Sequence, residues 1–356
     1  MLCRNSQRTR VDCRCWQSSS CPEGSGDDGL TLNRPLLSVV VPTIGRCELL
    51  RHTLSALAGQ IRPHLDQVEL LVIDNASVDG TREFLSSAGL PEFARVITNG
   101  DRLSLDDSFL RCIDQSTGEY INIFGDDDVP FPGFIEKALA IIRGGSPGMA
   151  YFNRLIGDED LSNFGELAHD GWGMVDRTLS APEFIRRFTH HPGFVSALIF
   201  SRTVWRDGEE FYRKEFDGYK FLARVYGGLL DRTCVFIGMP LLVQRRGVQI
   251  WKNDWPRYWL VSMPSLLLAL EAGGRTTDAV ATWRTTEVSV IRIGIDCIVA
   301  KAYGYRVADP FWAHAASYQS LRRRALIRML QYLVPPSVAG WVYFRRGKYK
   351  IKKVQS

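Results

Sequence analysis

Three consecutive aspartates, Asp126, Asp127 and Asp128, follow a short apolar run and precede two prolines. Adjacent carboxylates repel one another, so holding three together costs free energy unless a cation or a well-hydrated surface relieves the repulsion. Mg2+ and Mn2+ suit such a place because they take oxygen ligands, keep one or two carboxylates, and bind water and substrate phosphates besides. The triplet therefore predicts either a metal site that also binds a diphosphate or a solvated turn.

Polar residues also follow two other apolar runs, at positions 42–43 and 74–75. In open α/β sheets the ligand site lies outside the carboxyl ends of the strands. If the apolar runs are parallel strands, both polar pairs and the aspartates meet at one edge of the sheet despite their separation in sequence. The pair at 74–75 has a second interpretation, because Asp and Asn commonly form turns with their own backbone.

Strand-like and helix-like segments alternate from Pro35 onward. Short β-branched apolar runs predict buried strands at 36–41, 68–73, 93–99 and 119–124. Apolar residues at helical spacing predict helices over 49–57 and 105–115, the first of them stopped by Gly59 and Pro63. A short helix through Leu85 is also predicted, with Asp79 or Thr81 as its cap. This alternation is typical of right-handed crossovers and predicts an α/β fold with a mostly parallel sheet.

The composition is that of an ordinary globular protein. Of the 356 residues, 45% are hydrophobic and 23% are charged, which supplies a sizeable core and excludes a disordered chain. The net charge of +5 is unevenly spread, because residues 321–356 carry ten Lys or Arg and no Asp or Glu. The best candidate for a membrane span, residues 259–274, is too short and contains Pro264.

The first 34 residues differ from the rest of the chain. They are rich in Arg, Ser, Gly and Asp with almost no apolar periodicity, which predicts a disordered extension and no secretory signal. Four of the eight cysteines lie there, but their spacing lacks a C-x2-C pair and a nearby His, so zinc is the weaker interpretation. The other four are scattered among apolar neighbours and suit a reducing, cytoplasmic compartment.

Four segments carry a resemblance to a known family: SVVVPTIGR, LLVIDNASVDGT, TGEYINIFGDDDVPFPGF and EFDGYK. They resemble the family 2 glycosyltransferases, and among these the bacterial abequosyltransferase-type enzymes of cell-surface polysaccharide synthesis. The resemblance covers about residues 36–250 and implies the GT-A fold, a Rossmann-like α/β fold. It also implies a metal-dependent, inverting transfer of sugar from a nucleotide-sugar donor to a lipid-linked or polysaccharide acceptor. The chain then divides into an extension (1–34), a GT-A domain (35–255) and a helical, basic region (256–356).

The resemblance implies which residues bind the donor and the metal. Asp74 matches the carboxylate that receives the nucleotide base or ribose. The divalent metal, Mg2+ or Mn2+, falls to Asp127 or Asp128, because Gly125 stands where the first acid of the family often lies. The residues expected to bind the nucleotide sugar are Pro42, Thr43, Arg46, Asp74, Asn75, Asp126, Asp127 and Arg245.

An inverting transfer also needs a base on the face opposite the leaving group, to take the proton of the acceptor hydroxyl. Members of the family place this base about 90 residues beyond the aspartates, and Asp217 lies 89 residues after Asp128. Glu215 is the alternative base. Both acids have a simpler interpretation, because helix N-termini favour negative charge.

Other residues have weaker indications. Arg245 and Arg246 are candidates to meet phosphate oxygens, or else form a solvated pair, and Trp251 is a candidate lid residue. Aromatic residues are candidates to stack on sugars, although such residues more often belong to a core. The pair His190–His191 is a poor metal site, since adjacent side chains rarely converge. The aromatic candidates are Trp172, Phe194 and Trp205.

The basic C-terminal region combines Lys and Arg with aromatic residues. This combination suits an anionic membrane surface, and nucleic acid is the competing interpretation of the same charges. A lipid-linked acceptor favours the membrane, so we expect a cytoplasmic protein, peripheral on the inner face of the plasma membrane. Two other classes remain in view: a Rossmann dinucleotide enzyme, disfavoured because no G-x-G-x-x-G follows the first strand, and a non-catalytic sugar- or nucleotide-binding module.

Overall fold

The computed structural model of the protein describes residues 34–247, 258 and 262–279, together with five single positions between 325 and 338. The expected N-terminal extension with its four cysteines, Trp251, and most of the basic C-terminal region lie outside the described residues. None of the helices within the described ranges has the length and apolar content needed to cross a bilayer.

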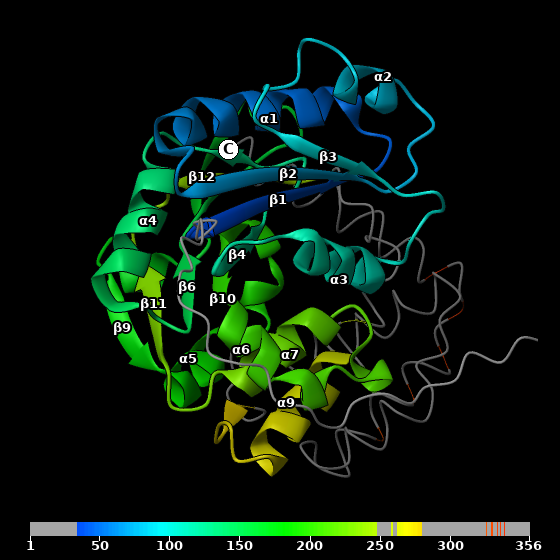
Figure 1. Cartoon of the computed structure of the whole chain (residues 1–356). Coiled ribbons are helices and arrows are strands. Elements are labelled where there is room, and N and C mark those ends of the chain that lie inside the picture. The colour runs from blue at the N-terminus through cyan, green and yellow to red at the C-terminus, as the bar shows by residue number, and fades with distance from the viewer. Residues whose placement is uncertain are drawn as a thin grey trace, which may run out of the picture. The chain divides into compact units, whose positions relative to one another are not determined.

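The described residues form a large mixed sheet and a small one (Figure 1). The large sheet has eight strands in the order β3-β2-β1-β4-β10-β6-β11-β9. Parallel pairing joins β3, β2, β1 and β4, whereas β10 lies antiparallel between β4 and β6. Its strands are β1 Leu37–Thr43, β2 Val68–Asp74, β3 Arg95–Thr98, β4 Tyr120–Ile123, β6 Met149–Phe152, β9 Arg177–Ser180, β10 Leu198–Ser201 and β11 Thr233–Ile237.

The small sheet lies beside the aspartates. Its strands are β5 Val129–Pro130, β7 Leu155–Gly157, β8 Phe164–Leu167 and β12 Leu242–Arg245, in the order β5-β12-β7-β8. β5 begins directly after Asp128, and its Val129 pairs with Val243 of β12. The small sheet therefore brings the end of β12, with Arg245, to the aspartate triplet.

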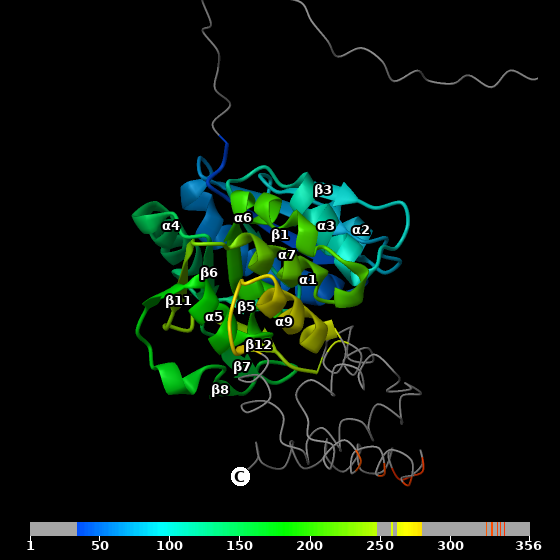
Figure 2. The ribbon, with the colours of Figure 1, turned by 90° about the horizontal axis from the view of Figure 1, so that it is seen from below.

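Helices cover both faces of the large sheet. Figure 1 shows α1 and α2 on one side of β1, β2 and β3, and α3 on the other. The helix α7 contacts α3, α6 and α9, and the view in Figure 2 shows these helices gathered together. The helices are α1 Cys47–Ile61, α2 Thr81–Leu85, α3 Leu105–Gln115, α4 Phe134–Gly145, α5 Ala181–Phe188, α6 Arg202–Asp207, α7 Lys220–Gly228 and α9 Met263–Ala272.

The predicted elements are confirmed in type and nearly in extent. The helix at 105–115 has the predicted bounds, and Ser104 caps it by accepting a hydrogen bond from the Asp107 amide. The first strand runs on through Pro42 and Thr43, which the sequence placed just beyond it. The prediction of a mostly parallel sheet is confirmed: β1 to β4 pair in parallel, as do β6 and β11, whereas β10 lies antiparallel to β4 and β6, and β9 lies antiparallel to β11.

Two predicted helix signals were wrong. Gly59 does not stop α1, which continues to Ile61 because Leu57 and Ile61 extend the buried stripe that packs on the core. Burial of that stripe outweighs the cost of about 1 kcal/mol for glycine in a helix. At α2 the cap position is Gly80, with no side-chain hydrogen bond, although an Asp79 carboxylate oxygen accepts from the Thr81 amide at 3.1 Å.

Two glycines allow α6 and α7 to pack in backbone contact. A Cβ atom at Gly228 would lie 1.9 Å from the Val204 carbonyl oxygen, and one at Gly208 would lie 1.8 Å from the Arg224 carbonyl oxygen. Such a clash is with backbone, so no side-chain rotation relieves it. This close packing fixes the second half of α7, from Arg224 to Gly228, against α6.

We expect Gly228→Ala to lower the free energy of unfolding by about 3 kcal/mol, because the added methyl group forces the two helices apart. Urea unfolding followed by circular dichroism measures the change. Gly59→Ala is the matched control: a Cβ atom at Gly59 would meet nothing within 4 Å, so the substitution should be neutral or stabilise by up to ~1 kcal/mol. Equal effects in both variants would contradict the contact between α6 and α7.

Candidate functional site

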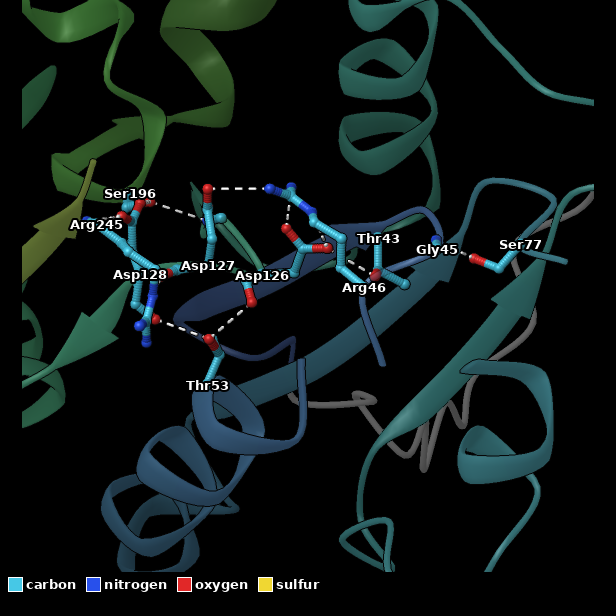
Figure 3. A network of polar contacts seen from close by, with 11 residues as sticks. Thr43, Gly45, Arg46, Thr53, Ser77, Asp126, Asp127, Asp128, Ser196 and Arg245 are labelled. Carbon is cyan, nitrogen blue, oxygen red and sulfur yellow. Dashed lines mark hydrogen bonds and ion pairs between the residues drawn. The ribbon is translucent and has the colours of Figure 1, made fainter. Parts of the chain in front are cut away.

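The aspartate triplet is buried at the carboxyl edge of the large sheet (Figure 3). Asp126 is fully buried and Asp128 is 4% exposed, whereas the Asp127 side chain is 13% exposed. A solvated turn would leave these side chains in bulk water. The structure therefore excludes that alternative and leaves three carboxylates whose burial must be compensated by partners.

Asp126 is held by the end of β1 and the residues that follow it. The Thr43 hydroxyl donates to Asp126 Oδ2 at 2.7 Å, and Arg46 Nε donates to the same oxygen at 3.2 Å. Arg46 Nη2 forms an ion pair with Asp126 Oδ1. Burial raises the pKa of Asp126 to about 7, although the attraction of Arg46 acts in the opposite direction.

Arg46 also reaches the second aspartate. Its Nη1 donates to Asp127 Oδ2 at 3.0 Å, so one guanidinium group spans two adjacent carboxylates. Bidentate pairing of this kind is a strong form of charge-assisted hydrogen bond. The chain thus supplies one cation of its own beside the triplet, and a divalent metal at this place stays a prediction.

Asp128 is held by different elements. Its Oδ2 accepts a hydrogen bond from the Ser196 hydroxyl, just before β10, and its Oδ1 accepts from the Arg245 amide at 3.2 Å. The Ser196 oxygen in turn accepts from the Gly125 amide at 2.9 Å. Burial and the neighbouring charge of Asp127 raise the pKa of Asp128 well above its ordinary value.

The backbone of the triplet is fixed from two sides. The Thr53 hydroxyl on α1 lies 3.0 Å from the Asp126 carbonyl oxygen and 2.8 Å from that of Asp128. Arg245, itself 6% exposed, donates from Nε to the Asp127 carbonyl oxygen at 3.0 Å and from Nη1 to a neighbouring loop carbonyl at 2.7 Å. In this structure Arg245 is a clamp on the aspartate loop, and its predicted role as a nucleotide-sugar ligand stays a prediction. Its exposed neighbour Arg246 pairs with Glu166 at 3.1 Å.

The end of β2 lies beside β1, with Asp74 paired in register with Thr43. Asp74 is fully buried; its Oδ1 accepts from the Ser77 amide at 3.0 Å, and its Oδ2 accepts from Arg82 Nε at 3.2 Å. The hydrogen bond from the Ser77 amide closes a local turn, which was the second interpretation of positions 74–75 in the sequence. A contact of Asp74 with the nucleotide stays a prediction.

Asn75 joins β2 to the segment before α3. Its amide group accepts from the Leu103 amide at 2.8 Å and donates to the Leu103 carbonyl oxygen at 3.1 Å. Its own backbone amide donates to the Thr43 carbonyl oxygen at 2.8 Å. The side chain of Asn75 is therefore committed to organising this edge of the sheet, and its predicted contact with the donor is not tested by these bonds.

The two candidate bases differ in their surroundings. Glu215 is 54% exposed and lies 3.8 Å from Arg213, whereas Asp217 is 28% exposed and lies 3.2 Å from Lys220 Nζ. Neither is at a helix N-terminus of the usual kind, since Glu215 lies in a short 3-10 turn, 214–216, and Asp217 follows it before α7 begins.

Two chains of contacts connect the turn that carries Asp217 with residues around the aspartates. The ring of Tyr219 packs against the backbone of Gly193, and the chain continues from there to Ser196, which binds Asp128. In the second chain of contacts, the Gly218 amide donates to the Asp106 carboxylate at 2.7 Å. Asp106 lies three residues after Leu103, whose amide donates to the Asn75 side chain. The base candidate and the triplet, 89 residues apart, therefore share one region of the fold.

Sequence reasoning missed three residues that build this site: Thr53, Asp106 and Ser196. Thr53 interrupts an apolar helical stripe, and a polar residue in such a stripe is a usable signal. Asp106 lies in the first turn of α3, where an acid is ordinary. Ser196 carries no signal in the sequence, because nothing there shows that it faces Asp128.

The aromatic candidates pack mainly against protein. Trp205 is 6% exposed and lies against Phe200 and the guanidinium of Arg224, so its expected role as a sugar platform is corrected to a core role. Phe194 lies under Arg154 and Trp172 packs on Phe188 and Phe236. Within the described ranges no group of three or more His, Cys, Asp or Glu side chains is arranged to hold a metal ion, the histidine pair included.

Comparisons with known proteins agree with this geometry. Residues 38–199 match the family model described as glycosyl transferase family 2. The chain is 35% identical over 112 residues to the abequosyltransferase RfbV of Salmonella typhimurium, which covers 30% of this chain and 32% of that protein. It is 22% identical over 178 residues to the putative teichuronic acid biosynthesis glycosyltransferase TuaG of Bacillus subtilis, covering 50% and 64% of the two chains.

The chain carries a family 2 glycosyltransferase domain.

Solved structures show the fold of this glycosyltransferase domain. Residues 1–349 of TarS from S. aureus superpose with a TM-score of 0.54 at 14% identity, covering 87% of this chain and 91% of that chain, and the same TarS fragment is known in complex with UDP-GlcNAc. The GT-A fold is thereby confirmed. The chain spans about a third of the abequosyltransferase and 64% of TuaG, so their activities are not transferred with the domain.

We expect Thr53→Val in the glycosyltransferase domain to lower the free energy of unfolding by about 1 to 2 kcal/mol, because two buried carbonyl oxygens lose their donor while the side-chain shape is kept. Binding of nucleoside diphosphate should weaken as the aspartate loop shifts. Chemical denaturation and calorimetric titration measure the two effects. Thr178→Val, at an exposed position of β9, is the control; a Thr53→Val protein as stable as this control would contradict the clamp.

Proposed function

We propose that the protein is an inverting glycosyltransferase, which moves a sugar from a nucleoside diphosphate donor to the hydroxyl of a lipid-linked or polysaccharide acceptor in cell-surface glycan synthesis. The observation that carries the proposal is the buried cluster of Asp126, Asp127, Thr43 and Arg46 at the carboxyl edge of the sheet, within a family 2 domain. Buried acids are costly and need a purpose or a partner. A site for a sugar nucleotide supplies that purpose.

The donor would lie along the ends of β1, β2 and β4. In this proposal Pro42 and Thr43 border the nucleotide, and Asp74 and Asn75 receive its base or ribose. Asp126 supplies a carboxylate toward the ribose. The register that sets Thr43 beside Asp74, and the bond from Thr43 to Asp126, support a single continuous surface for this ligand.

The carboxylate oxygens of the aspartate triplet suit a hard divalent cation of the kind that GT-A enzymes commonly use. Asp127 is the best candidate ligand, since its side chain is the most exposed of the three, and Asp128 is the alternative. Mg2+ and Mn2+ bind through one or two protein carboxylates plus substrate phosphates, and Asp127 and Asp128 would supply such carboxylates. Such a cation, when bound, would neutralise charge on the leaving diphosphate.

Asp217 would act as the base in a single displacement. The acceptor hydroxyl gives its proton to the Asp217 carboxylate as its oxygen forms the new bond to the anomeric carbon. The bond from that carbon to the diphosphate oxygen breaks at the same time, and the nucleoside diphosphate leaves with the bonding electrons. Its partial exposure and its ion pair with Lys220 support Asp217 over the more exposed Glu215.

We expect Asp217→Asn to reduce transfer or donor hydrolysis by about 10²-fold or more, because a positioned base contributes this much, while nucleotide binding is retained. Turnover assays with sugar nucleotides and calorimetric titration of the nucleoside diphosphate measure the two properties. Glu215→Gln, two residues away, is the matched control and should keep its activity. Loss of turnover in the control alone would move the role of base to Glu215.

A screen of nucleoside diphosphates with and without Mn2+ separates the enzyme from its rivals. We expect a thermal shift for one base that depends on Mn2+ and disappears in Asp127→Asn. A shift with no turnover of any sugar nucleotide would favour a non-catalytic binding module. A shift with nicotinamide or flavin dinucleotides in place of these ligands would favour a Rossmann dinucleotide enzyme.

The same proposal places the protein at the inner face of the plasma membrane. Residues 321–356 hold ten basic residues and no acid, and at helical positions within this segment Met329 is 49% and Leu333 is 69% exposed. Exposed apolar side chains four residues apart, flanked by positive charge, suit an anionic lipid surface. This arrangement supports lipid over nucleic acid as the partner, since nucleic acid has no use for the apolar side chains.

We expect the double variant Met329→Glu and Leu333→Glu to bind vesicles of mixed phosphatidylcholine and phosphatidylglycerol at least about tenfold more weakly than the parent chain, because two apolar side chains leave the lipid. Co-sedimentation of the full chain measures binding. Met174→Glu with Val175→Glu, at exposed apolar positions elsewhere (61% and 62%), is the control and should bind normally. Equal binding by all three proteins would refute the membrane contact.

A further inference from the structure

Asp106 is an acid that the proposed reaction does not use, yet it is 2% exposed. It lies in the first turn of α3, which packs against α7 and β1. Burying an ionised carboxylate costs several kcal/mol unless partners compensate. The identity of those partners therefore indicates what the residue does.

The partners of Asp106 belong to the turn that carries Asp217. Asp106 Oδ2 accepts from the Gly218 amide at 2.7 Å and lies 3.5 Å from Lys220 Nζ. The same ammonium group lies 3.2 Å from Asp217 Oδ1. One lysine thus bridges two carboxylates, one buried and one partly exposed.

The turn itself has no freedom to move away. Gly218 has a φ of +82°, and a Cβ atom there would lie 2.3 Å from the Tyr258 ring, so both conformation and space require glycine. Tyr258 closes the turn on one side and Asp106 holds its amide on the other. The direction in which Asp217 leaves the backbone is consequently determined by these two contacts.

We propose that Asp106 is a positioning residue for Asp217: it holds the Gly218 amide and shares the Lys220 ammonium with the base, and so sets the direction in which the Asp217 carboxylate points. The inference rests on the proposed role of Asp217. Asp106 does not touch substrate in this scheme and acts through its neighbour.

The electrostatics of the pair agree with the geometry. Burial raises the pKa of Asp106 to about 6, the charge of Asp217 acts in the same direction, and Lys220 opposes both. Asp106 Oδ1 is buried and receives no hydrogen bond from the described residues, which favours a proton there.

The other groups around Asp106 are few. Tyr212 donates from its hydroxyl to the Asp106 carbonyl oxygen at 3.4 Å, and burial, followed by the charge of Asp106, raises the pKa of Tyr212 to about 12. Asp107 is exposed on the same helix turn. From the strands packed against α3, β1 has no titratable side chain, and Tyr120 of β4 bonds to a distant carbonyl oxygen. Asp217 and Lys220 are therefore the charged side chains that act directly on Asp106.

The test compares pH profiles of kcat/KM for Asp106→Asn, which keeps an oxygen for the Gly218 amide and removes the charge. We expect the parent chain to show a limb near pH 6 that Asp106→Asn lacks, because burial raises the pKa of Asp106 to about 6 and the amide of the variant does not titrate. Nucleoside diphosphate binding should stay unchanged. Asp107→Asn is the matched control, with the profile of the parent chain. An acid limb at the same pH in Asp106→Asn and the parent would overturn the proposal.

A second variant keeps the test decisive if Asp106→Asn fails to fold. Lys220→Gln removes the bridging ammonium, and the limb that belongs to Asp106 should then move up, because the charge of Lys220 lowers the pKa of Asp106. An unmoved limb in Lys220→Gln would also overturn the inference. Failure of the proposed function itself is recognised separately, since Asp217→Asn would then leave turnover unchanged whatever the Asp106 variant does.

Discussion

The ion pair between Arg46 and the first two aspartates is the interaction on which the site depends. Asp126 is fully buried with a raised pKa, and without the guanidinium it would face Asp127 with no compensating charge. Arg46 lies between β1 and α1, directly before the first residue of α1. From this position its side chain reaches the aspartates that follow β4. The fold therefore supplies one positive charge of its own beside the first two acids.

The remaining architecture keeps those strand ends together. Parallel pairing sets Thr43 beside Asp74, and Asn75 extends the edge to the segment before α3. Close backbone packing of α6 and α7 fixes α7, whose preceding turn presents Asp217. Each connection links residues far apart in sequence, so the site is a property of the assembled sheet.

The sequence was sufficient to predict the helices and strands, and insufficient to predict which side chains bond to one another in the site. Apolar runs that end in polar residues predicted β1, β2 and β4 and the meeting of Thr43 with the aspartates, because strand periodicity and parallel topology follow from local pattern. The sequence did not predict the direction of β10, because a short apolar run has the same pattern in a parallel and in an antiparallel strand. Ser196 and Asp106 were missed for a related reason: a serine and an acid at a helix start have ordinary local explanations, and their importance arises from contacts about 70 and 110 residues away.

The small sheet gives the triplet an unusual mechanical position. Asp126 is tethered to the large sheet through Thr43, whereas Asp128 accepts its second hydrogen bond from the end of β12 and leads directly into β5. The three carboxylates thus straddle a seam between two independently hydrogen-bonded sheets. If one sheet moved relative to the other, the spacing of the three carboxylates would change. A ligand that bridged the carboxylates would therefore hold the two sheets together.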